Sequence, residues 1–214
     1  MQNNTERYIF VFDLENTEMS KAEKTRQYII EKTAPIFNMK GYAGTSLTDL
    51  TEATGLTKGS IYGNFTNKEE VATEVYIYNI SVLHEKLKAG IEAETTAEGK
   101  LRAFLSFYRN GWKRLNEKGG CPILNCSVEA DDNLPFLKKT VQDSVKKWAN
   151  TLSRIMENGK KTGEIKDIDS TQYAYIICAL IEGGVMLAKI SDGPKHLNTA
   201  LDRAQLIVDQ EILA

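Results

Sequence analysis

The stretch that decides the fold lies between residues 41 and 70 and reads GYAGTSLTDLTEATGLTKGSIYGNFTNKEE. It contains two short segments of helical pattern, residues 47–54 and 58–65, with Gly55 between them. A Ser or Thr stands directly before each segment, where its side chain can cap the first turn of a helix. Two short helices joined at a glycine are the geometry of a helix-turn-helix. The sequence therefore predicts this motif over residues 46–65.

Longer helices flank the motif. Residues 21–39 carry apolar side chains at three- and four-residue spacing, which predicts an amphipathic helix. Lys40-Gly41 is expected to end it, because glycine suits a left-handed cap. After the motif, Asn67 can cap another helix that begins Lys68-Glu69-Glu70, with its acids in the first turn where the helix dipole favours them.

The two short helices divide into an inward and an outward set of side chains. Their apolar positions are spaced to pack the helices together: Leu47, Leu50, Leu56 and Ile61. The opposite side of the second helix carries small or hydrogen-bonding residues, which suit contact with phosphates and a DNA groove: Thr57, Lys58, Ser60 and Tyr62. Gly59 removes a side chain where that helix would press on the duplex. Lys58 is long enough to reach a base edge such as guanine O6 or N7.

Residues 41–70 resemble the signature of the tetracycline-repressor (TetR) family along their whole length. The rest of the chain resembles it in helical layout and in the segment Gly-Cys-Pro-Ile-Leu-Asn at 120–125. The resemblance implies phosphate contacts from Thr45, Ser46, Tyr62 and Lys68, and groove contacts from Thr57, Lys58, Gly59 and Ser60. Asn64 is a further candidate, although Gly63-Asn64 stands where the family usually has a larger aromatic or basic pair. Thr51 and Thr54 replace the family's usual alanines and should still pack.

The chain as a whole is expected to be all-α, with about nine helices. Hydrophobic residues make up 42% and charged residues 26% of the 214, close to the averages of soluble domains. Residues 19–68 form the predicted three-helix DNA-binding domain, and residues 69–214 a helical domain for ligand binding and dimerisation. Residues 1–18 are polar and acidic around one aromatic patch. They are either a flexible arm or upstream sequence read through from an early start codon, with Met19 the real start.

Charge supports a role for residues 19–68 in nucleic-acid binding. The whole chain carries a net charge of only −2, but this segment carries +3.

The three cysteines, Cys121, Cys126 and Cys178, lack metal-ligand spacing and are expected to be reduced and structural. Neither a membrane span nor a secretory signal is expected, which favours the cytoplasm.

The larger domain holds the candidates for ligand binding. Phe104, Tyr108 and Trp112 lie on one helical face and either line a ligand cavity or form ordinary core. Glu182 stands in the apolar segment 173–188, where it is either a polar group in that cavity or a residue paired at a helix interface. The expected effector is an unidentified small molecule that is apolar or amphipathic.

A homodimer is predicted through helices at about Ser170–Ile190 and Lys195–Leu213. The first has too little polar surface to face water, and the second repeats an apolar seam. The residues assigned to this contact are Ala179, Gly183, Gly184, Leu197, Leu201, Ala204 and Val208. A two-fold axis there would present two reading helices to a palindromic double-stranded operator.

Three functions compete for this sequence. The first is a transcription regulator, expected to be a repressor released from DNA by a small-molecule inducer. The second is an architectural or protein-binding module with the same fold and no inducer. The third is a helical enzyme, but the sequence has no catalytic motif, and no cofactor or metal site is expected. His84 and His196 lie far apart in the sequence, without nearby Cys or acidic ligands, and are expected to be ordinary surface or core residues.

Overall fold

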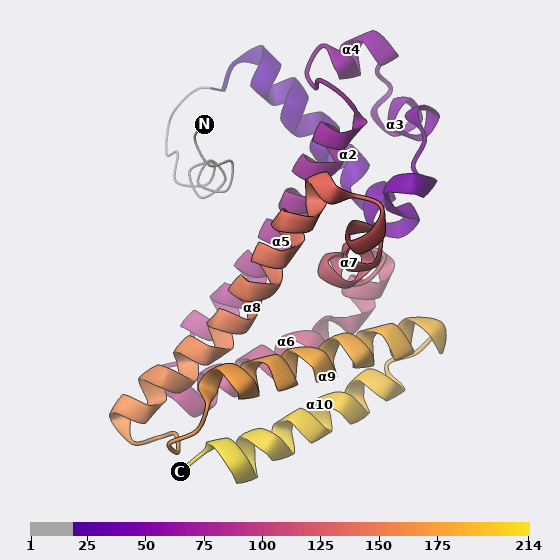
Figure 1. Cartoon of the computed structure of the whole chain (residues 1–214). Coiled ribbons are helices and arrows are strands. Elements are labelled where there is room, and N and C mark those ends of the chain that lie inside the picture. Colours follow the sequence, from indigo (N-terminus) through magenta and orange to yellow (C-terminus); the bar gives the residue numbers. More distant parts are fainter. Residues whose placement is uncertain (1–18) are drawn as a thin grey trace.

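The computed structural model describes residues 19–214, which are helical almost throughout (Figure 1). In chain order the helices are α2 (Lys21–Gly44), α3 (Leu47–Thr54), α4 (Lys58–Tyr62), α5 (Lys68–Glu92), α6 (Ala97–Glu117), α7 (Pro122–Asp132), α8 (Pro135–Thr162), α9 (Ser170–Ile190) and α10 (Lys195–Ile207). A π-helical segment, Val208–Ile212, continues α10. Over residues 19–214 there is no β-strand, only an isolated bridge between Ile165 and Leu213. The predicted all-α class is confirmed, and the extension at residues 1–18 lies outside the described residues.

Side-chain caps begin the helices around the motif, as the sequence predicts. The caps are Ser46, Thr57 and Asn67, whose side-chain oxygens accept hydrogen bonds from backbone N–H groups three residues later, at 3.1, 3.2 and 2.9 Å. Each bond satisfies a donor that the first turn of a helix leaves unpaired. The second motif helix is shorter than predicted, because the chain turns at Gly63 directly after Tyr62.

The first helix runs past its predicted end but breaks at Gly41, where the backbone has a φ of 72° and a ψ of 178°. The carboxylate of Glu129, on α7, accepts hydrogen bonds there from the backbone N–H groups of Tyr42 (2.8 Å) and Ala43 (3.2 Å). A Cβ atom on residue 41 would lie 2.7 Å from Glu129 Oε2, so the close approach and the positive φ both require glycine. α7 is thereby tied to the segment that leads into the motif.

The interior divides into a small cluster around the motif, a large one in the body and a third between α5, α7 and the start of α8. The small cluster joins α2, α3 and α4 to the first turns of α5, and includes Leu50 and Ile61, both fully buried. The large cluster joins the end of α5 to α6 and α8–α10. Because α5 contributes to both clusters, it connects the two parts of the molecule beyond the predicted boundary at residue 68.

The segment Gly-Cys-Pro-Ile-Leu-Asn at 120–125 contains the start of a helix. α7 begins at Pro122, because proline fits the first helical position, where its missing N–H costs nothing. On α8, Val141, Trp148, Leu152 and Ile155 are buried and Val145 is half-buried, so a stripe at four- and three-residue spacing faces the interior. In Figure 1 the antiparallel pair α9 and α10 lies at the end of the molecule opposite α3 and α4.

Candidate functional site

The motif helices α3 and α4 are held by their inward side chains. Leu50 and Ile61 are fully buried, while Leu47 and Leu56 pack half-buried against the same cluster. Gly55 closes α3 with a φ of 68°, the left-handed conformation expected of a turn glycine. The predicted inward set is therefore confirmed, and it fixes α4 with its opposite side in solvent.

That outer side of α4 consists of Thr57, Lys58, Gly59 and Ser60, all exposed. The Thr57 hydroxyl is occupied by its capping bond, whereas Lys58 forms no ion pair within residues 19–214. A Cβ atom on Gly59 would meet nothing closer than the Thr57 Oγ1 atom at 3.9 Å. The start of α4 is thus a smooth surface with one free cationic side chain, which suits close approach to a groove.

The other predicted DNA contacts are more constrained. Tyr62 is half-buried, and the Asn64 side chain donates to the Ser60 carbonyl at 2.9 Å. Lys68 Nζ donates to the Tyr42 carbonyl at 2.6 Å and lies 4.2 Å from the centre of the Tyr42 ring. Partial burial lowers the pKa of Lys68. Only its remaining donors are free for a phosphate.

Thr45 does not support the phosphate contact assigned to it. Its side chain is buried, with 1% of the residue exposed, and its hydroxyl donates to the Gly41 carbonyl at 2.6 Å. Ser46 is exposed, but its hydroxyl exchanges hydrogen bonds with Asp49 as part of a capping box. Hydrogen bonds from Lys40 and Ser46 hold the pKa of Asp49 well below its usual range. Thr45 is therefore a core residue, whereas its neighbour Ser46 caps α3.

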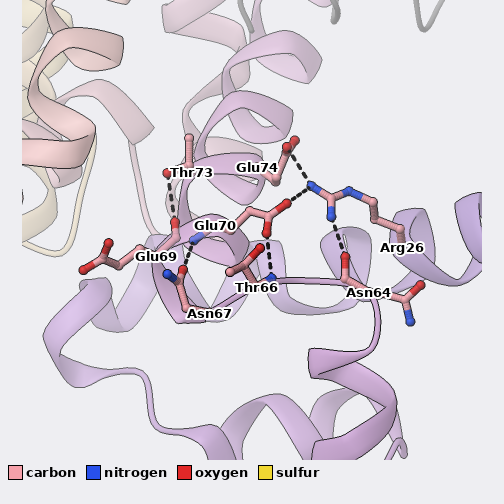
Figure 2. A network of polar contacts seen from close by, with 8 residues as sticks. All are labelled: Arg26, Asn64, Thr66, Asn67, Glu69, Glu70, Thr73 and Glu74. Carbon is pink, nitrogen blue, oxygen red and sulfur yellow. Dashed lines mark hydrogen bonds and ion pairs between the residues drawn. The ribbon is translucent and has the colours of Figure 1, made fainter. Parts of the chain in front are cut away.

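Arg26 positions the end of the motif, a role that sequence reasoning missed. Its guanidinium donates to the Asn64 carbonyl (2.6 Å), to Glu70 (2.7 Å) and to Glu74 (2.8 Å), as Figure 2 shows. It also stacks over the Phe65 ring at 4.1 Å. Glu70 also accepts from the backbone N–H of Thr66 at 2.7 Å. One side chain of α2 thus holds both the turn after α4 and the start of α5, which fixes the angle of α4.

Comparison with known proteins agrees with this geometry. Residues 29–75 match the family described as bacterial regulatory proteins, tetR family, and residues 97–204 match the tetracyclin repressor-like C-terminal domain. A tetR-family regulator from Cytophaga hutchinsonii is 40% identical, with a TM-score of 0.86 over 90% of this chain and 97% of its own. The chain belongs to the tetR family of bacterial regulatory proteins. It is accordingly a DNA-binding transcriptional regulator.

More distant relatives share this architecture. The transcriptional repressor DhaR of Mycobacterium sp. strain GP1 is 25% identical over 177 residues, which is 82% of this chain and 88% of DhaR. A cysteine mutant of the tetR-family regulator CifR, complexed with a 26-base-pair operator duplex, shares the fold at 17% identity. Its TM-score is 0.73, over 89% of this chain and 97% of that one.

In the body of this tetR-family chain, the four predicted pocket residues do not line one cavity. Phe104, Tyr108 and Trp112 are all buried in the large cluster. The rings of Phe104 and Tyr108 lie 5.8 Å apart, and both pack against Trp148. Phe104 and Trp112 are therefore core residues, and only Tyr108 also borders an open cavity.

The carboxyl of Glu182 is buried beside a thiol. The Sγ atom of Cys121 donates to Glu182 Oε1 at 2.9 Å, and Oε2 has no hydrogen-bond partner within the described chain. Burial raises the pKa of Glu182 to about 7. Burial likewise raises the pKa of the Cys121 thiol well above its usual range, so this cysteine is not an activated nucleophile. The predicted interface role of Glu182 takes the form of a contact within one chain, between α9 and the residue before α7.

The open cavity that Tyr108 borders lies between α2, α5, α6 and the loop after α6, and has a volume of about 140 Å³. Its inner wall includes buried residues, Ala34, Asn38 and Pro122. Its mouth is lined by exposed charged side chains, Glu31, Lys86, Arg114 and Lys118. Of the four predicted pocket residues, only Tyr108 lines this cavity.

The residues assigned to the dimer contact separate into two groups. Leu197, Leu201, Ala204 and Val208 are fully buried within the protomer, so they are core and not a free surface. Gly184 is also internal, since a Cβ atom there would lie 3.0 Å from Ala200 Cβ and Leu197 Cα. Ala179 is exposed, and a Cβ atom on Gly183 would meet nothing within 4 Å. Only these two remain on an open face.

Proposed function

We propose that the protein is a dimeric repressor that reads a palindromic operator with α4 and leaves it when a small molecule binds the body. The exposed start of α4, with its inner side locked by Ile61, is the observation that carries the DNA-reading part. A fixed helix with a free Lys58 and a smooth Gly59 can enter a major groove without rearrangement. The proposed contact set is Lys58, Gly59, Ser60 and Thr57, with phosphate contacts from Ser46, Tyr62, Asn64 and Lys68.

The proposed dimer uses the outer face of α9. By length and composition this helix could cross a membrane, yet only 39% of its most apolar window is buried inside the protomer. Its large exposed apolar side chains are Tyr175, Ile176, Met186, Leu187 and Ile190, and Leu206 of α10 is exposed as well. In a DNA-binding protein such a face needs a partner, and a second copy of the same helix supplies one. We place the assembly in the cytoplasm, with the operator.

Two glycines of α9 give a matched test of this face. Gly183→Arg puts charge and volume on the open side, so we expect monomers that keep their helical content and lose operator affinity. Gly184→Ala faces α10 within the protomer, so we expect a lower melting temperature instead. Sedimentation velocity and circular dichroism measure the two effects. A dimeric Gly183→Arg variant, or a monomeric wild-type protein at micromolar concentration, would show that the face is assigned wrongly.

The operator itself can be found by selecting bound fragments from genomic DNA and footprinting the fragments that selection enriches. Two reading helices related by a two-fold axis should protect two half-sites about 34–36 Å apart, or about 10 base pairs. The cavity at the junction of the motif domain and the body favours the ligand-responsive regulator over a module without an inducer. Selection that enriches no sequence, or enriches sites without two-fold symmetry, would refute the proposal.

A further inference from the structure

The cavity of about 140 Å³ lies where the motif domain meets the body of the molecule. One wall comes from α2 and α5 and includes Ala34, Asn38 and Leu83. The other comes from α6 and the loop after it, and includes Phe107, Tyr108 and Gly111. A cavity of about 150 Å³ is large enough for a benzene ring. A larger ligand would therefore extend through the mouth or separate the walls.

The inner part of the cavity suits an aromatic ring. Ala34, Tyr108 and Pro122 are buried there, and Phe107 and Leu83 are half-buried. Ligand cavities are usually apolar with a few polar groups that fix orientation. Asn38 is one such group in the wall, although both of its donors are already used by main-chain carbonyls, at 2.6 and 3.0 Å.

The mouth carries an excess of positive charge. Three cations, Lys86, Arg114 and Lys118, line it together with one carboxylate, Glu31. None of these cations forms a salt bridge within the described part of the chain. Glu31 accepts a hydrogen bond from Gln27 of its own helix, at 2.8 Å. An anionic group at the mouth would gain charge-assisted hydrogen bonds that a neutral or cationic group cannot make.

We propose that this cavity binds an aromatic carboxylate, with the ring against Phe107 and Tyr108 and the carboxylate at Arg114 and Lys118. This inference rests on the proposed function, because it names the chemical class of the effector. The site is distinct from the Phe104–Trp112–Glu182 set, whose members do not line it.

The position of the cavity explains how an occupant would act on DNA binding. Asn38 of α2 donates to the carbonyls of Lys118 and Gly120, on the opposite wall. Lys189 of α9 contacts the same loop: it donates to the Gly119 carbonyl at 2.6 Å, and to Asn125 of α7 at 3.0 Å. The loop thus lies between the helix that carries Arg26 and the helix proposed to form the dimer. A ligand that moves α2 away from this loop changes the separation of the two reading helices.

Calorimetric titration of the purified full-length dimer with probes that share one ring system tests the ligand class. The probes are 2-naphthoate, neutral 2-naphthamide and cationic 2-naphthylmethylammonium. We expect 2-naphthoate to bind at least about tenfold more tightly than the amide, and the cation most weakly. Equal binding of the three, tighter binding of the cation, or no binding of 2-naphthoate would overturn the proposal.

Variants then locate the site. Arg114→Gln should weaken 2-naphthoate binding about tenfold, while Lys113→Gln, an exposed neighbour that does not line the cavity, should leave it unchanged. Gly111→Leu fills the cavity and should abolish binding, whereas Gly90→Leu, at an open position on α5, is its control. Thermal melts confirm that each variant is folded. Retained binding in folded Gly111→Leu would place the ligand elsewhere.

Operator affinity separates this proposal from the one on which it rests. The protein without ligand is first tested on the selected operator, and failure there refutes the proposed function. Operator binding without 2-naphthoate binding refutes only the effector class. We expect 2-naphthoate to lower operator affinity at least about tenfold in the wild type and not in Gly111→Leu. Ligand binding that leaves operator affinity unchanged would overturn the proposed coupling.

Discussion

The buried carboxyl of Glu182 should make the stability of the protein depend on pH in a direction opposite to that of a salt-bridged acid. Burial raises its pKa from 4.5 to about 7, so between these values the folded state holds a proton that the unfolded state has lost. Stability contributed by this proton is present below about pH 4.5 and is lost as the pH rises through about 7. The full difference corresponds to about 3 kcal/mol.

Glu182→Gln removes the titrating group and keeps the size of the side chain. The variant should therefore gain stability relative to the wild type as the pH rises from about 5 to about 8, by about 2 to 3 kcal/mol. In a chain of this size that is about 4 to 12 °C in melting temperature. The other groups near this carboxyl, Cys121, Cys178 and Tyr108, have a raised pKa and stay neutral over this range.

Urea denaturation followed by circular dichroism at both pH values, at one protein concentration, measures the difference. Glu92→Gln is the control, because the side chain of Glu92 is 64% exposed. Changes common to all the proteins, such as protonation of His84, cancel in the comparison. Parallel pH dependence of wild type and Glu182→Gln, within about 0.5 kcal/mol, would refute the assignment of a neutral buried acid.

Further predictions concern the motif and the body. In competition binding, Lys58→Ala should reduce the preference for operator over random DNA by about 1–3 kcal/mol, while Lys68→Ala should weaken binding to the two kinds of DNA alike. If Lys58→Ala lowered the affinity for operator and for random DNA equally, Lys58 would not read bases. Arg26→Ala should destabilise the fold by about 1–3 kcal/mol in urea denaturation, through the lost bonds to the Asn64 carbonyl and Glu70, and Lys24→Ala, an exposed neighbour, should not. Leu201→Ala should cost about 2–5 kcal/mol of stability in denaturation, because Leu201 is buried within the protomer. Leu206→Ala should weaken dimers in sedimentation and leave the helices intact, because Leu206 is exposed. A stable but monomeric Leu201→Ala variant would instead place Leu201 in the dimer contact, as the sequence predicts.

The local features of the motif could be predicted because they depend on neighbouring residues. A capping serine or threonine, a turn glycine and the spacing of Leu50 and Ile61 all act within a few residues, and the structure has them where the sequence places them. Lys58 and Ser60 are exposed for the same reason, since they lie opposite the buried side of a short helix.

Contacts between distant segments could not be predicted in the same way. Arg26 meets Glu70 and Glu74 across 44 and 48 residues, and no local pattern pairs them. The spacing of Leu197 and Leu201 correctly indicates a buried face, but it does not say whether the same chain or a second copy covers it. The burial of Thr45 shows the same limit: its hydroxyl donates to a carbonyl only four residues away, but whether the residue is covered depends on the tertiary fold.

In the proposed function, α4 reads the operator sequence as part of a two-fold assembly. Its most direct test is the ratio of the dissociation constant for a shuffled duplex to that for the selected palindrome of equal length and composition, both measured at one salt concentration near physiological. We expect a ratio of at least about 10³, which falls sharply when one half-site is shuffled. A ratio near one, or full affinity for a duplex with a single half-site, would contradict it.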